Sequence, residues 1–346
     1  MLKKHGDYIV DEVLVTGGSG FIALHCIQQL LSLGFKVRCT VRSEKKKLEV
    51  IKAMQHHSLN SDLLTIVFAD LMNDEGWEDA VKGCKYVLHI ASPFVTQEPA
   101  NEDILIRPAV DGTIRLLNAC TVHQVEKVVL TSSFVAIGYG HAEPKIYDER
   151  DWTQYNDRSV TAYAKSKTLA EKTAWDFVQS LDEKRRFKLT VLNPVGVMGP
   201  MLSDDIGTTN AELLLLLRGK FPRVPKLHVG WVDVRDVAKA HITAMTCAST
   251  DNERIILCKK EFWLVEIAEM FRKAGFVKPS VKEMPNVIVK ILALFMRDLS
   301  GIANYVGQEV YANKDKAKGI FDWKFISIEE SAAETANQLD RMGLVN

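Results

Sequence analysis

Short apolar runs rich in valine, isoleucine and leucine alternate with longer amphipathic stretches through the first half of the chain. Such runs are typical of strands buried on both faces of a parallel sheet, each followed by a helical crossover. The pattern predicts an α/β fold: a doubly wound parallel sheet with helices on both faces. The predicted strands are residues 12–16, 36–42, 64–68, 86–90, 127–131 and 188–192, and the predicted helices include 21–33, closed by Gly34, and 104–122.

The alternation stops after Leu192, where NPVGVMGP holds two prolines and two glycines that interrupt regular structure. Residues 229–258 resume a strand, helix and strand pattern that we expect to return to the sheet, and most of the remainder favours amphipathic helix. We therefore expect two parts. Residues 1–193 plus about 229–258 would form the first domain, and about 194–228 plus 259–346 a smaller, mostly helical lobe.

A glycine-rich turn directly follows the first predicted strand. It places Gly17, Gly20 and Ala23 in a G-x-x-G-x-x-A pattern that opens a long amphipathic helix. Gly17 permits the tight turn, Gly20 lets the backbone approach a pyrophosphate, and Ala23 lets the helix pack closely on the strand. The N-terminus of the helix then binds the anion. This combination is typical of a Rossmann-type dinucleotide-binding domain.

The end of the second predicted strand indicates which dinucleotide binds. An acidic residue there would accept a hydrogen bond from a ribose hydroxyl, whereas an arginine accommodates a 2'-phosphate. The chain has Arg42 at this position, followed by Lys45, Lys46 and Lys47. The guanidinium suits a phosphate and the lysines add charge, although a lysine run by itself is typical of a solvated helix face. NADP(H) is therefore favoured over NAD(H).

Two further strand ends carry candidate cofactor contacts. Asp70 follows the third predicted strand, where its carboxylate would either accept a hydrogen bond from an adenine amino group or stabilise a turn. The fourth predicted strand runs from His89 into small residues, including Ala91, that would let the backbone lie against a ribose. We expect His89 itself to be a buried, hydrogen-bonded core histidine.

Tyr163 and Lys167 lie four residues apart in a stretch that favours a helix, so they share one helix face. A tyrosine with a pKa of about 10 is a weak acid, but a nearby ammonium stabilises its phenolate and lowers that pKa. Tyr163 would then donate a proton to a carbonyl oxygen. The fifth strand ends in Thr131-Ser132-Ser133, at the edge of the sheet where ligands bind in open α/β folds. Either Ser132 or Ser133 could hold that oxygen.

The glycine turn, the Thr131-Ser132-Ser133 strand end and the Tyr163-x-x-x-Lys167 pair together resemble the extended short-chain dehydrogenase/reductase family. The segments VLTSS, YAKSKTLAEKTAW, LNPVGVMGP and VDVRDVAKAH are similar to those of dihydroflavonol reductases, cinnamoyl-CoA reductases and yeast-type carbonyl, or methylglyoxal, reductases. The resemblance runs through most of the chain and is weakest after about residue 260.

The resemblance implies transfer of a hydride from C4 of the nicotinamide of NADPH to a substrate carbonyl. Tyr163 would be the general acid, Ser133 would orient the oxygen, and Lys167 would lower the tyrosine pKa and bind the nicotinamide ribose. Arg42 would contact the 2'-phosphate and Pro194 would pass beside the nicotinamide. The expected cofactor contacts are Gly17, Gly20, Phe21, Ile22, Arg42, Asp70, Leu71, Ala91, Thr131, Tyr163, Lys167, Pro194 and Val197.

Departures from the family bear on the substrate. The asparagine that flavonoid reductases place shortly after the serine pair is absent, and the segment before Lys167 does not match the CoA-ester reductases. These differences favour a general aldehyde or ketone as the substrate. An apolar pocket would suit a hydrophobic carbonyl. Its predicted walls are Phe134, Val135, Tyr139, Met198, Met201 and residues 213–217.

Two other functions fit parts of the same pattern. A nucleotide-sugar epimerase or dehydratase shares the fold and the Tyr-Lys pair, but it must also grip a diphosphate. The candidate second anion site consists of Arg218, Lys220, Arg223 and Lys226. A non-catalytic NADP-binding protein would keep the glycine turn, but the intact Tyr163 and Lys167 speak against it. An NADPH-dependent carbonyl reductase remains the favoured function.

Composition narrows the remaining classes. A chain of 346 residues, 47% hydrophobic and 25% charged, can bury a sizeable core, which excludes disordered, collagen-like and disulfide-framework proteins. Its 44 cationic residues equal its 44 acidic ones, so nucleic acid is not an expected partner. The six cysteines show no metal-ligand spacing, so we expect reduced thiols and no metal.

The sequence shows neither a secretory signal nor a membrane span, which bears on where the protein is located. No secretory signal precedes the first strand, and no run reaches the roughly 18 to 20 apolar residues that a membrane span needs. We expect a cytoplasmic protein without a membrane span, a monomer or homodimer whose partner is a small aldehyde or ketone. The apolar segment 287–296, interrupted by Lys290, fits either a pocket wall or a helix that faces a partner or a membrane.

Overall fold

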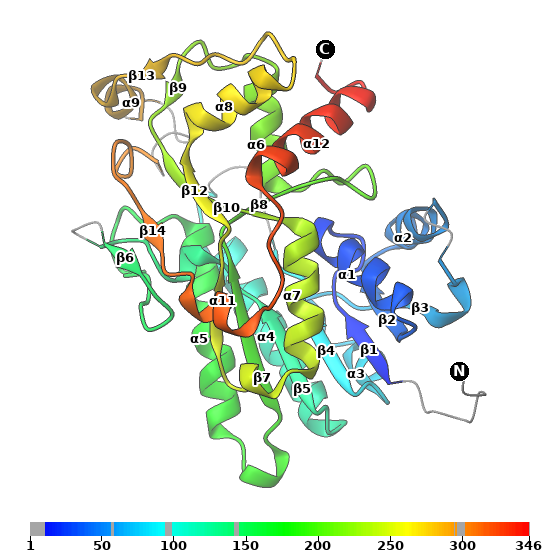
Figure 1. Cartoon of the computed structure of the whole chain (residues 1–346). Coiled ribbons are helices and arrows are strands. Elements are labelled where there is room, and N and C mark those ends of the chain that lie inside the picture. The colour runs from blue at the N-terminus through cyan, green and yellow to red at the C-terminus, as the bar shows by residue number, and fades with distance from the viewer. Residues whose placement is uncertain are drawn as a thin grey trace.

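A parallel seven-stranded sheet forms the centre of the computed structural model (Figure 1), in the order β11-β7-β5-β4-β1-β2-β3. The structure describes residues 11–56, 59–93, 99–141, 145–293, 295 and 302–345. All six predicted strands are present, with ends that differ from the prediction by at most two residues. The strands are β1 (Glu12–Val15), β2 (Lys36–Val41), β3 (Leu64–Phe68), β4 (Tyr86–His89), β5 (Lys127–Thr131), β7 (Lys188–Pro194) and β11 (Arg254–Leu257).

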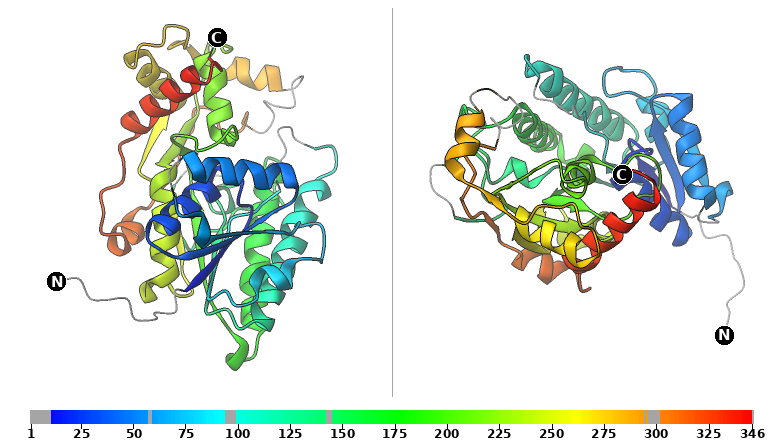
Figure 2. Two further views of the ribbon diagram at one scale, coloured as in Figure 1. Left: turned by 90° about the vertical axis from the view of Figure 1, so that its right-hand side faces the viewer. Right: turned by 90° about the horizontal axis from the view of Figure 1, so that it is seen from above.

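Helices cover both faces of this sheet (Figure 2). Val13 and Val15 of β1 pack on one face with α1 (Phe21–Ser32), α2 (Glu44–His56) and α7 (Val234–Thr246). The intervening Leu14 packs on the other face with α3 (Trp77–Val81), α4 (Asp103–Val122) and α5 (Ala162–Ser180). Because adjacent strand residues point to opposite faces, one apolar strand serves two cores. The predicted doubly wound fold is confirmed.

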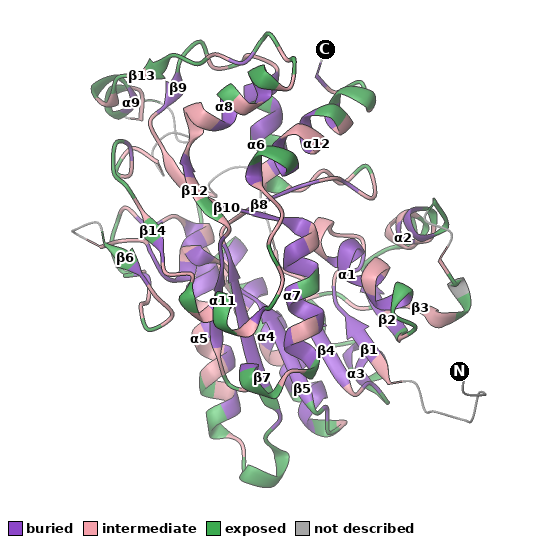
Figure 3. Ribbon diagram, in the orientation of Figure 1, coloured by how far each residue is buried: buried purple, intermediate pink, exposed green. Residues whose placement is uncertain are grey.

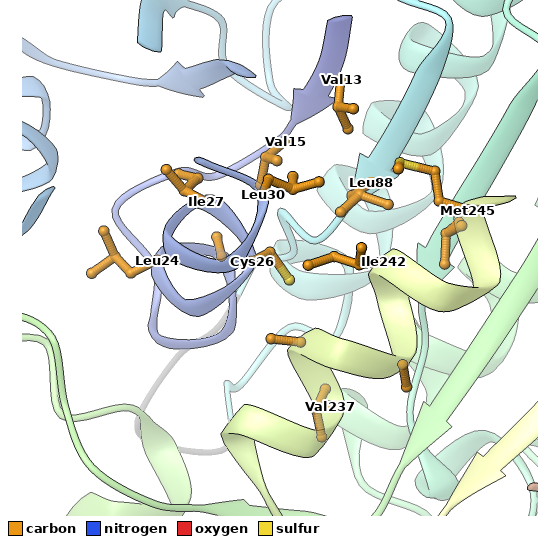
Figure 4. Packing of buried hydrophobic residues seen from close by; sticks show 14 of the residues in the cluster. Val13, Val15, Leu24, Cys26, Ile27, Leu30, Leu88, Val237, Ile242 and Met245 are labelled. Carbon is orange, nitrogen blue, oxygen red and sulfur yellow. The ribbon is translucent and has the colours of Figure 1, made fainter. Parts of the chain in front are cut away.

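The contacts of α1, the helix after the glycine turn, explain why its ends agree closely with the prediction. α1 buries Ile27 and Leu30 against α7 and the sheet (Figure 4). The helix ends where Gly34 adopts a φ of 85°, a left-handed conformation that favours glycine. The amide of Phe35 then donates to the carbonyl of Leu30 and satisfies one of the last helical acceptors. This packing holds the glycine turn rigidly against the sheet.

A second, smaller group of elements lies beyond the carboxyl ends of the strands (Figure 1). α6 (Thr208–Leu217), α8 (Leu264–Lys273) and α12 (Ile328–Arg341) share a core with a three-stranded sheet of β8 (Gly196–Met198), β10 (His228–Asp233) and β12 (Lys260–Trp263). The strand, helix and strand predicted at 229–258 are β10, α7 and β11. Only β11 joins the large sheet, because β10 pairs with β8 and β12 instead.

The C-terminal segment contacts both cores. Ala317 and Phe321 are buried with α1 and α7, whereas Ile328 and Leu339 are buried in the second core. The Asp236 carboxylate of α7 anchors the connection by accepting hydrogen bonds from the indole of Trp323 and the amide of Ile326. The division into 1–193 plus 229–258 and 194–228 plus 259–346 stays a prediction.

Most of the large sheet is buried, whereas the outer sides of the surrounding helices are exposed (Figure 3). The described parts of the chain also contain shorter elements. They are the strands β6 (Ile146–Tyr147), β9 (Val224–Pro225), β13 (Glu283–Met284) and β14 (Tyr311–Ala312), the helices α9 (Asn286–Ala293) and α11 (Asp315–Ile320), and the 3-10 turns 61–63, 134–136, 183–185 and 248–250. Within the described ranges, no helix is long and apolar enough to cross a membrane. Residues 1–10 and parts of segment 287–296 lie outside the described residues.

We predict that Leu30→Ala lowers the free energy of unfolding by about 2–5 kcal/mol, because it leaves a cavity between α1, α7 and the sheet. Urea unfolding followed by circular dichroism measures the change. Leu33→Ala is the matched control, since Leu33 ends the same helix with 64% of its surface exposed. The control should stay within about 0.5 kcal/mol of the wild type. Equal losses in the two variants would contradict this account of the core.

Candidate functional site

A cavity of about 900 Å³ runs along the carboxyl ends of the parallel strands. Every predicted catalytic and cofactor-contacting residue lines it, although these residues come from the ends of several strands and from two helices, α1 and α5. They are Gly17, Gly20, Phe21, Ile22, Arg42, Asp70, Leu71, Ala91, Thr131, Ser133, Tyr163, Lys167, Pro194 and Val197. The structure therefore brings the whole predicted set together in one place.

The glycine turn leaves space for a bound group at the start of α1. Gly17 has a φ of 67°, and a Cβ atom there would lie 3.0 Å from the Cα of Ala91, so only glycine fits without strain. Gly20 is the N-cap of α1, and no side chain caps the helix. The first amides of α1 therefore keep their hydrogen-bonding capacity for an anion in the cavity.

Thr16 ties the glycine turn to the end of β4. Its hydroxyl oxygen accepts hydrogen bonds from the amides of Ile90 and Ala91, at 3.0 and 2.9 Å. Its proton is then available to the Nδ1 atom of His89, 2.9 Å away. Burial, followed by the charge of Lys167, lowers the pKa of His89 to about 3, so the ring is neutral at physiological pH. His89 is thus the buried, hydrogen-bonded histidine that the sequence predicted.

The cations predicted after β2 divide into two groups. Arg42 and Lys46 line the cavity, whereas Lys47 pairs with Glu44 at 3.1 Å on the surface of α2. Lys46 also binds Glu49, with 2.6 Å between its Nζ and Oε2 of the carboxylate. Arg42 is exposed and forms no ion pair with any residue that the structure describes. Of the cations predicted after β2, Arg42 is therefore the one with the most capacity for a phosphate.

The turn expected at Asp70 is present, and the adenine contact stays a prediction. Its Oδ1 atom accepts a hydrogen bond of 2.9 Å from the amide of Met72, as in a turn that follows a strand. The residue also lines the cavity together with Leu71. The turn therefore holds the carboxylate in place at the cavity wall.

The catalytic candidates are positioned by the start of α5. The hydroxyl of Thr161 caps this helix by accepting a hydrogen bond of 3.2 Å from the amide of Ala164. Tyr163 lies in the first turn, and its hydroxyl lies close enough to the side chain of Ser133 for that side chain to lower its pKa. One turn further, the Nζ atom of Lys167 donates to the carbonyl of Thr131 at 3.3 Å. Helix α5 is thus attached at two points to the end of β5.

Burial dominates the electrostatics of this pair. It raises the pKa of Tyr163 to about 12, although the hydrogen bond from Ser133 opposes the shift. It lowers the pKa of Lys167 to about 8, although the charge of Glu171 opposes that shift. The net shift of the Tyr163 pKa is therefore upward, because burial outweighs the lowering that the sequence predicted from Lys167. At neutral pH Tyr163 carries a transferable proton beside a mostly protonated Lys167.

The two candidate serines have different surroundings. The hydroxyl of Ser132 donates to the buried carboxylate of Glu171 at 2.5 Å, so its proton is already used. The hydroxyl of Ser133 interacts with that of Tyr163, and its contacts with the carbonyl of Pro194 and the amide of Val135 are long, at 3.4 and 3.3 Å. Of the two, Ser133 is the serine placed to meet a ligand in the cavity.

Sequence reasoning missed several residues that line the cavity. They include Ser19, Thr40, Trp77, Asp103, Arg107, Asp205, Thr208 and Thr209. Ser19 lies inside the predicted turn and could have been found there. Thr40 lies on β2 and Trp77 begins α3, whereas the others come from the starts of α4 and α6 and from the segment that leads into α6. Only the tertiary fold brings these elements to the cavity. Arg107 adds a second exposed arginine to the wall.

The predicted apolar pocket walls lie elsewhere. Met198, Met201 and most of the leucines at 213–217 are buried in the core between α6, α8 and α12. Phe134 and Tyr139 pack in a separate cluster with Tyr147 and Cys258. None of the predicted wall residues is among the described residues that line the cavity. The apolar spacing in α6 corresponds to its packing in this core.

One known protein family matches most of the chain. Residues 14–283 match the model of the 3-beta hydroxysteroid dehydrogenase/isomerase family. The chain belongs to this family. The predicted resemblance to extended short-chain dehydrogenases/reductases is confirmed, since the family match and the relatives below both fall within that group.

Several named reductases are similar to most of the chain. The NADPH-dependent methylglyoxal reductase of Saccharomyces cerevisiae is 30% identical over 348 residues, covering 94% of this chain and 97% of the relative. A cinnamoyl-CoA reductase of Medicago truncatula is 35% identical over 254 residues, covering 71% and 75%. The crystal structure of the yeast methylglyoxal/isovaleraldehyde reductase complexed with NADPH covers 96% of this chain and 99% of its own, with 27% identity and a TM-score of 0.80.

Proposed function

We propose that this chain is an NADPH-dependent reductase that transfers a hydride to the carbonyl of an aldehyde or ketone, with Tyr163 as the general acid. The observation that carries the proposal is the convergence of Ser133, Tyr163 and Lys167 with the glycine turn and Arg42 on one cavity. The similarity to an NADPH-dependent methylglyoxal reductase and to a cinnamoyl-CoA reductase also supports the proposal.

The cavity fits an NADP dinucleotide. Gly17 and the uncapped start of α1 suit a pyrophosphate, and Arg42 with Lys46 suits a 2'-phosphate. Asp70 and Leu71 would border the adenine, and Thr131, Lys167, Pro194 and Val197 the nicotinamide end. When bound, NADPH supplies the hydride from C4 of its nicotinamide.

The residues of the chain supply the proton and the electrostatics. Tyr163 is protonated at neutral pH and gives its proton to the carbonyl oxygen as negative charge develops there. Ser133 orients the same oxygen, because its hydroxyl already lies with that of Tyr163. The ammonium of Lys167 stabilises the resulting phenolate and binds the nicotinamide ribose. Burial of both groups strengthens these interactions because it excludes water.

The geometry favours this function over a nucleotide-sugar epimerase or dehydratase. The candidate second anion site does not lie at the cavity: Arg218 donates to the carbonyl of Leu344, and Arg223 to that of Glu283. Lys226 lies over the ring of Trp263. None of these cations is among the described cavity residues. Loss of NADPH absorbance with aromatic aldehydes and α-diketones tests the reductase directly, and inactivity on all of them with tight NADPH binding would overturn it.

We predict that Tyr163→Phe lowers kcat by about 10²–10⁴-fold, because it removes the proton donor, while the Kd for NADPH changes little. Steady-state kinetics and fluorescence titration measure the two quantities. Tyr311→Phe is the control, since Tyr311 is an exposed tyrosine hydrogen-bonded to Glu309. A Tyr163→Phe protein with wild-type kcat would remove Tyr163 from the mechanism.

Arg42→Asp should raise the KM for NADPH by about tenfold or more and shift the preference toward NADH, because it replaces a phosphate-binding cation with an acid. Lys45→Asp makes the same change of charge in the same segment, at a residue that is not among those lining the cavity. Its effect on KM should be much smaller. If the ratio of kcat/KM for NADPH to kcat/KM for NADH is the same in the two variants, the assignment of Arg42 to the 2'-phosphate is wrong.

The value of kcat/KM for NADPH should fall as pH rises through about 8, approaching tenfold per pH unit. The reason is that Lys167 has a lowered pKa of about 8, and its charged form is the one required. A pH-rate profile measures this fall. Lys172→Met is the control, since Lys172 is another lysine of α5 and lies over the ring of Trp152. This variant should show the same fall in kcat/KM above pH 8. A profile that stays flat up to the ordinary lysine range, about pH 10, would refute the role of the Lys167 charge.

A further inference from the structure

A fully buried carboxylate lies directly behind the candidate catalytic residues. Glu171 is on α5, one turn after Lys167, and only 1% of its surface is exposed. Its Oε1 atom accepts from Nε of Arg254 at 2.5 Å and from the indole of Trp175 at 3.4 Å. Its Oε2 atom accepts from Ser132 at 2.5 Å and from the amide of Asn193 at 2.8 Å. An ionised carboxylate has about four acceptor positions, so its orientation is fully determined.

These partners come from different elements and meet at the end of the sheet. Ser132 follows β5, Asn193 lies on β7 and Arg254 on β11, so one side chain of α5 contacts three adjacent strands. The amide of Asn193 also donates to the backbone carbonyl of Ser133 at 3.2 Å. Glu171 therefore reaches Ser133 by two routes: through its neighbour Ser132 in the chain and through Asn193.

Arg254 is itself held firmly. Its Nη1 atom donates to the carbonyls of Glu149 and Asp151 at 2.7 and 2.8 Å. Its guanidinium lies 3.6 Å from the ring centroid of Trp152, and only 8% of the residue is exposed. A buried ion pair of this kind adds little stability compared with apolar packing, since both charges lose their hydration. What it provides here is a fixed position for the carboxylate.

We propose that Glu171, held by Arg254, is a positioning residue that fixes Ser133 relative to Tyr163 and Lys167 for carbonyl reduction. The inference rests on the proposed function and adds to it a residue that touches neither substrate nor cofactor. Without the carboxylate, Ser132 and Asn193 lose a shared acceptor, and the Ser133 hydroxyl is no longer held beside that of Tyr163. A small displacement of this kind is costly because the reacting groups must be aligned closely.

The test compares three variants under NADPH saturation. Glu171→Gln should lower kcat by about 10²-fold, and Ser132→Ala, which keeps the buried ion pair, by about tenfold. The KM for the carbonyl substrate and the Kd for NADPH should change far less than kcat. Trp175→Phe is the matched control, because it removes only the 3.4 Å contact with the same carboxylate. Its kcat should stay close to that of the wild type.

Two readouts separate positioning from a purely structural role. Combining Ser132→Ala with Glu171→Gln should be no worse than Glu171→Gln alone, since both changes break the same connection. The folded fraction and thermal midpoint of each variant are measured alongside kcat. A wild-type kcat in Ser132→Ala and in folded Glu171→Gln would overturn the positioning role, and so would fully additive losses.

The same experiment distinguishes this failure from a failure of the proposed function. Wild-type protein and Tyr163→Phe are assayed in the same series. An active wild type with an inactive Tyr163→Phe and unaffected Glu171 and Ser132 variants overturns the positioning role alone. A wild type that oxidises no NADPH with any carbonyl overturns the proposed function and this inference together.

Discussion

The site depends on the attachment of α5 to the carboxyl ends of β5 and β7. Tyr163 and Lys167 are useful only if their helix lies at a fixed distance from Ser133, which belongs to a different element. Three sets of contacts set that distance: the bond from Lys167 to the carbonyl of Thr131, the bond between Tyr163 and Ser133, and the contacts of the Glu171 carboxylate. Apolar packing of α4 and α5 against the sheet stabilises the attachment, but it is not directional and does not set the distance as these contacts do.

The same burial that fixes the geometry sets the protonation states. A tyrosine and a lysine buried side by side each tend toward the neutral form, which is why the tyrosine pKa rises and the lysine pKa falls. Glu171 opposes the shift at Lys167 and so helps to keep its charge. The result is a proton donor and a cation that coexist near neutral pH. The proposed reduction of a carbonyl uses both groups.

Much of the fold could be predicted because local signals agree with the global architecture. The buried strands are nearly all apolar, Gly34 ends α1, and the glycine turn lies between strand and helix. The prediction failed where pairing is decided at a distance: β10 looks like the other strands but joins β8 and β12 in the smaller sheet. Similarly, the leucines of α6 fit either a pocket or a core, and only the positions of α8 and α12 decide for the core.

The candidate site was predictable in part for a related reason. Residues at strand ends converge at one edge of a parallel sheet, so Arg42, Asp70 and Ser133 could be grouped from the sequence. The separate surroundings of Ser132 and Ser133 could not, because they depend on Glu171, Asn193 and Arg254, which are far apart in the chain. Nor could the pKa shifts, since burial outweighs the neighbouring charge that the sequence makes visible.

The central claim is that a hydride passes from NADPH to a carbonyl carbon within this cavity. The most direct test is to supply NADPH deuterated at C4 of the nicotinamide together with an aldehyde, and to locate the label in the alcohol by mass spectrometry and NMR. The account predicts deuterium on the carbinol carbon, transferred from one face of the nicotinamide only. Alcohol without deuterium from either C4-labelled isomer, or bound NADPH that is never oxidised, would contradict it.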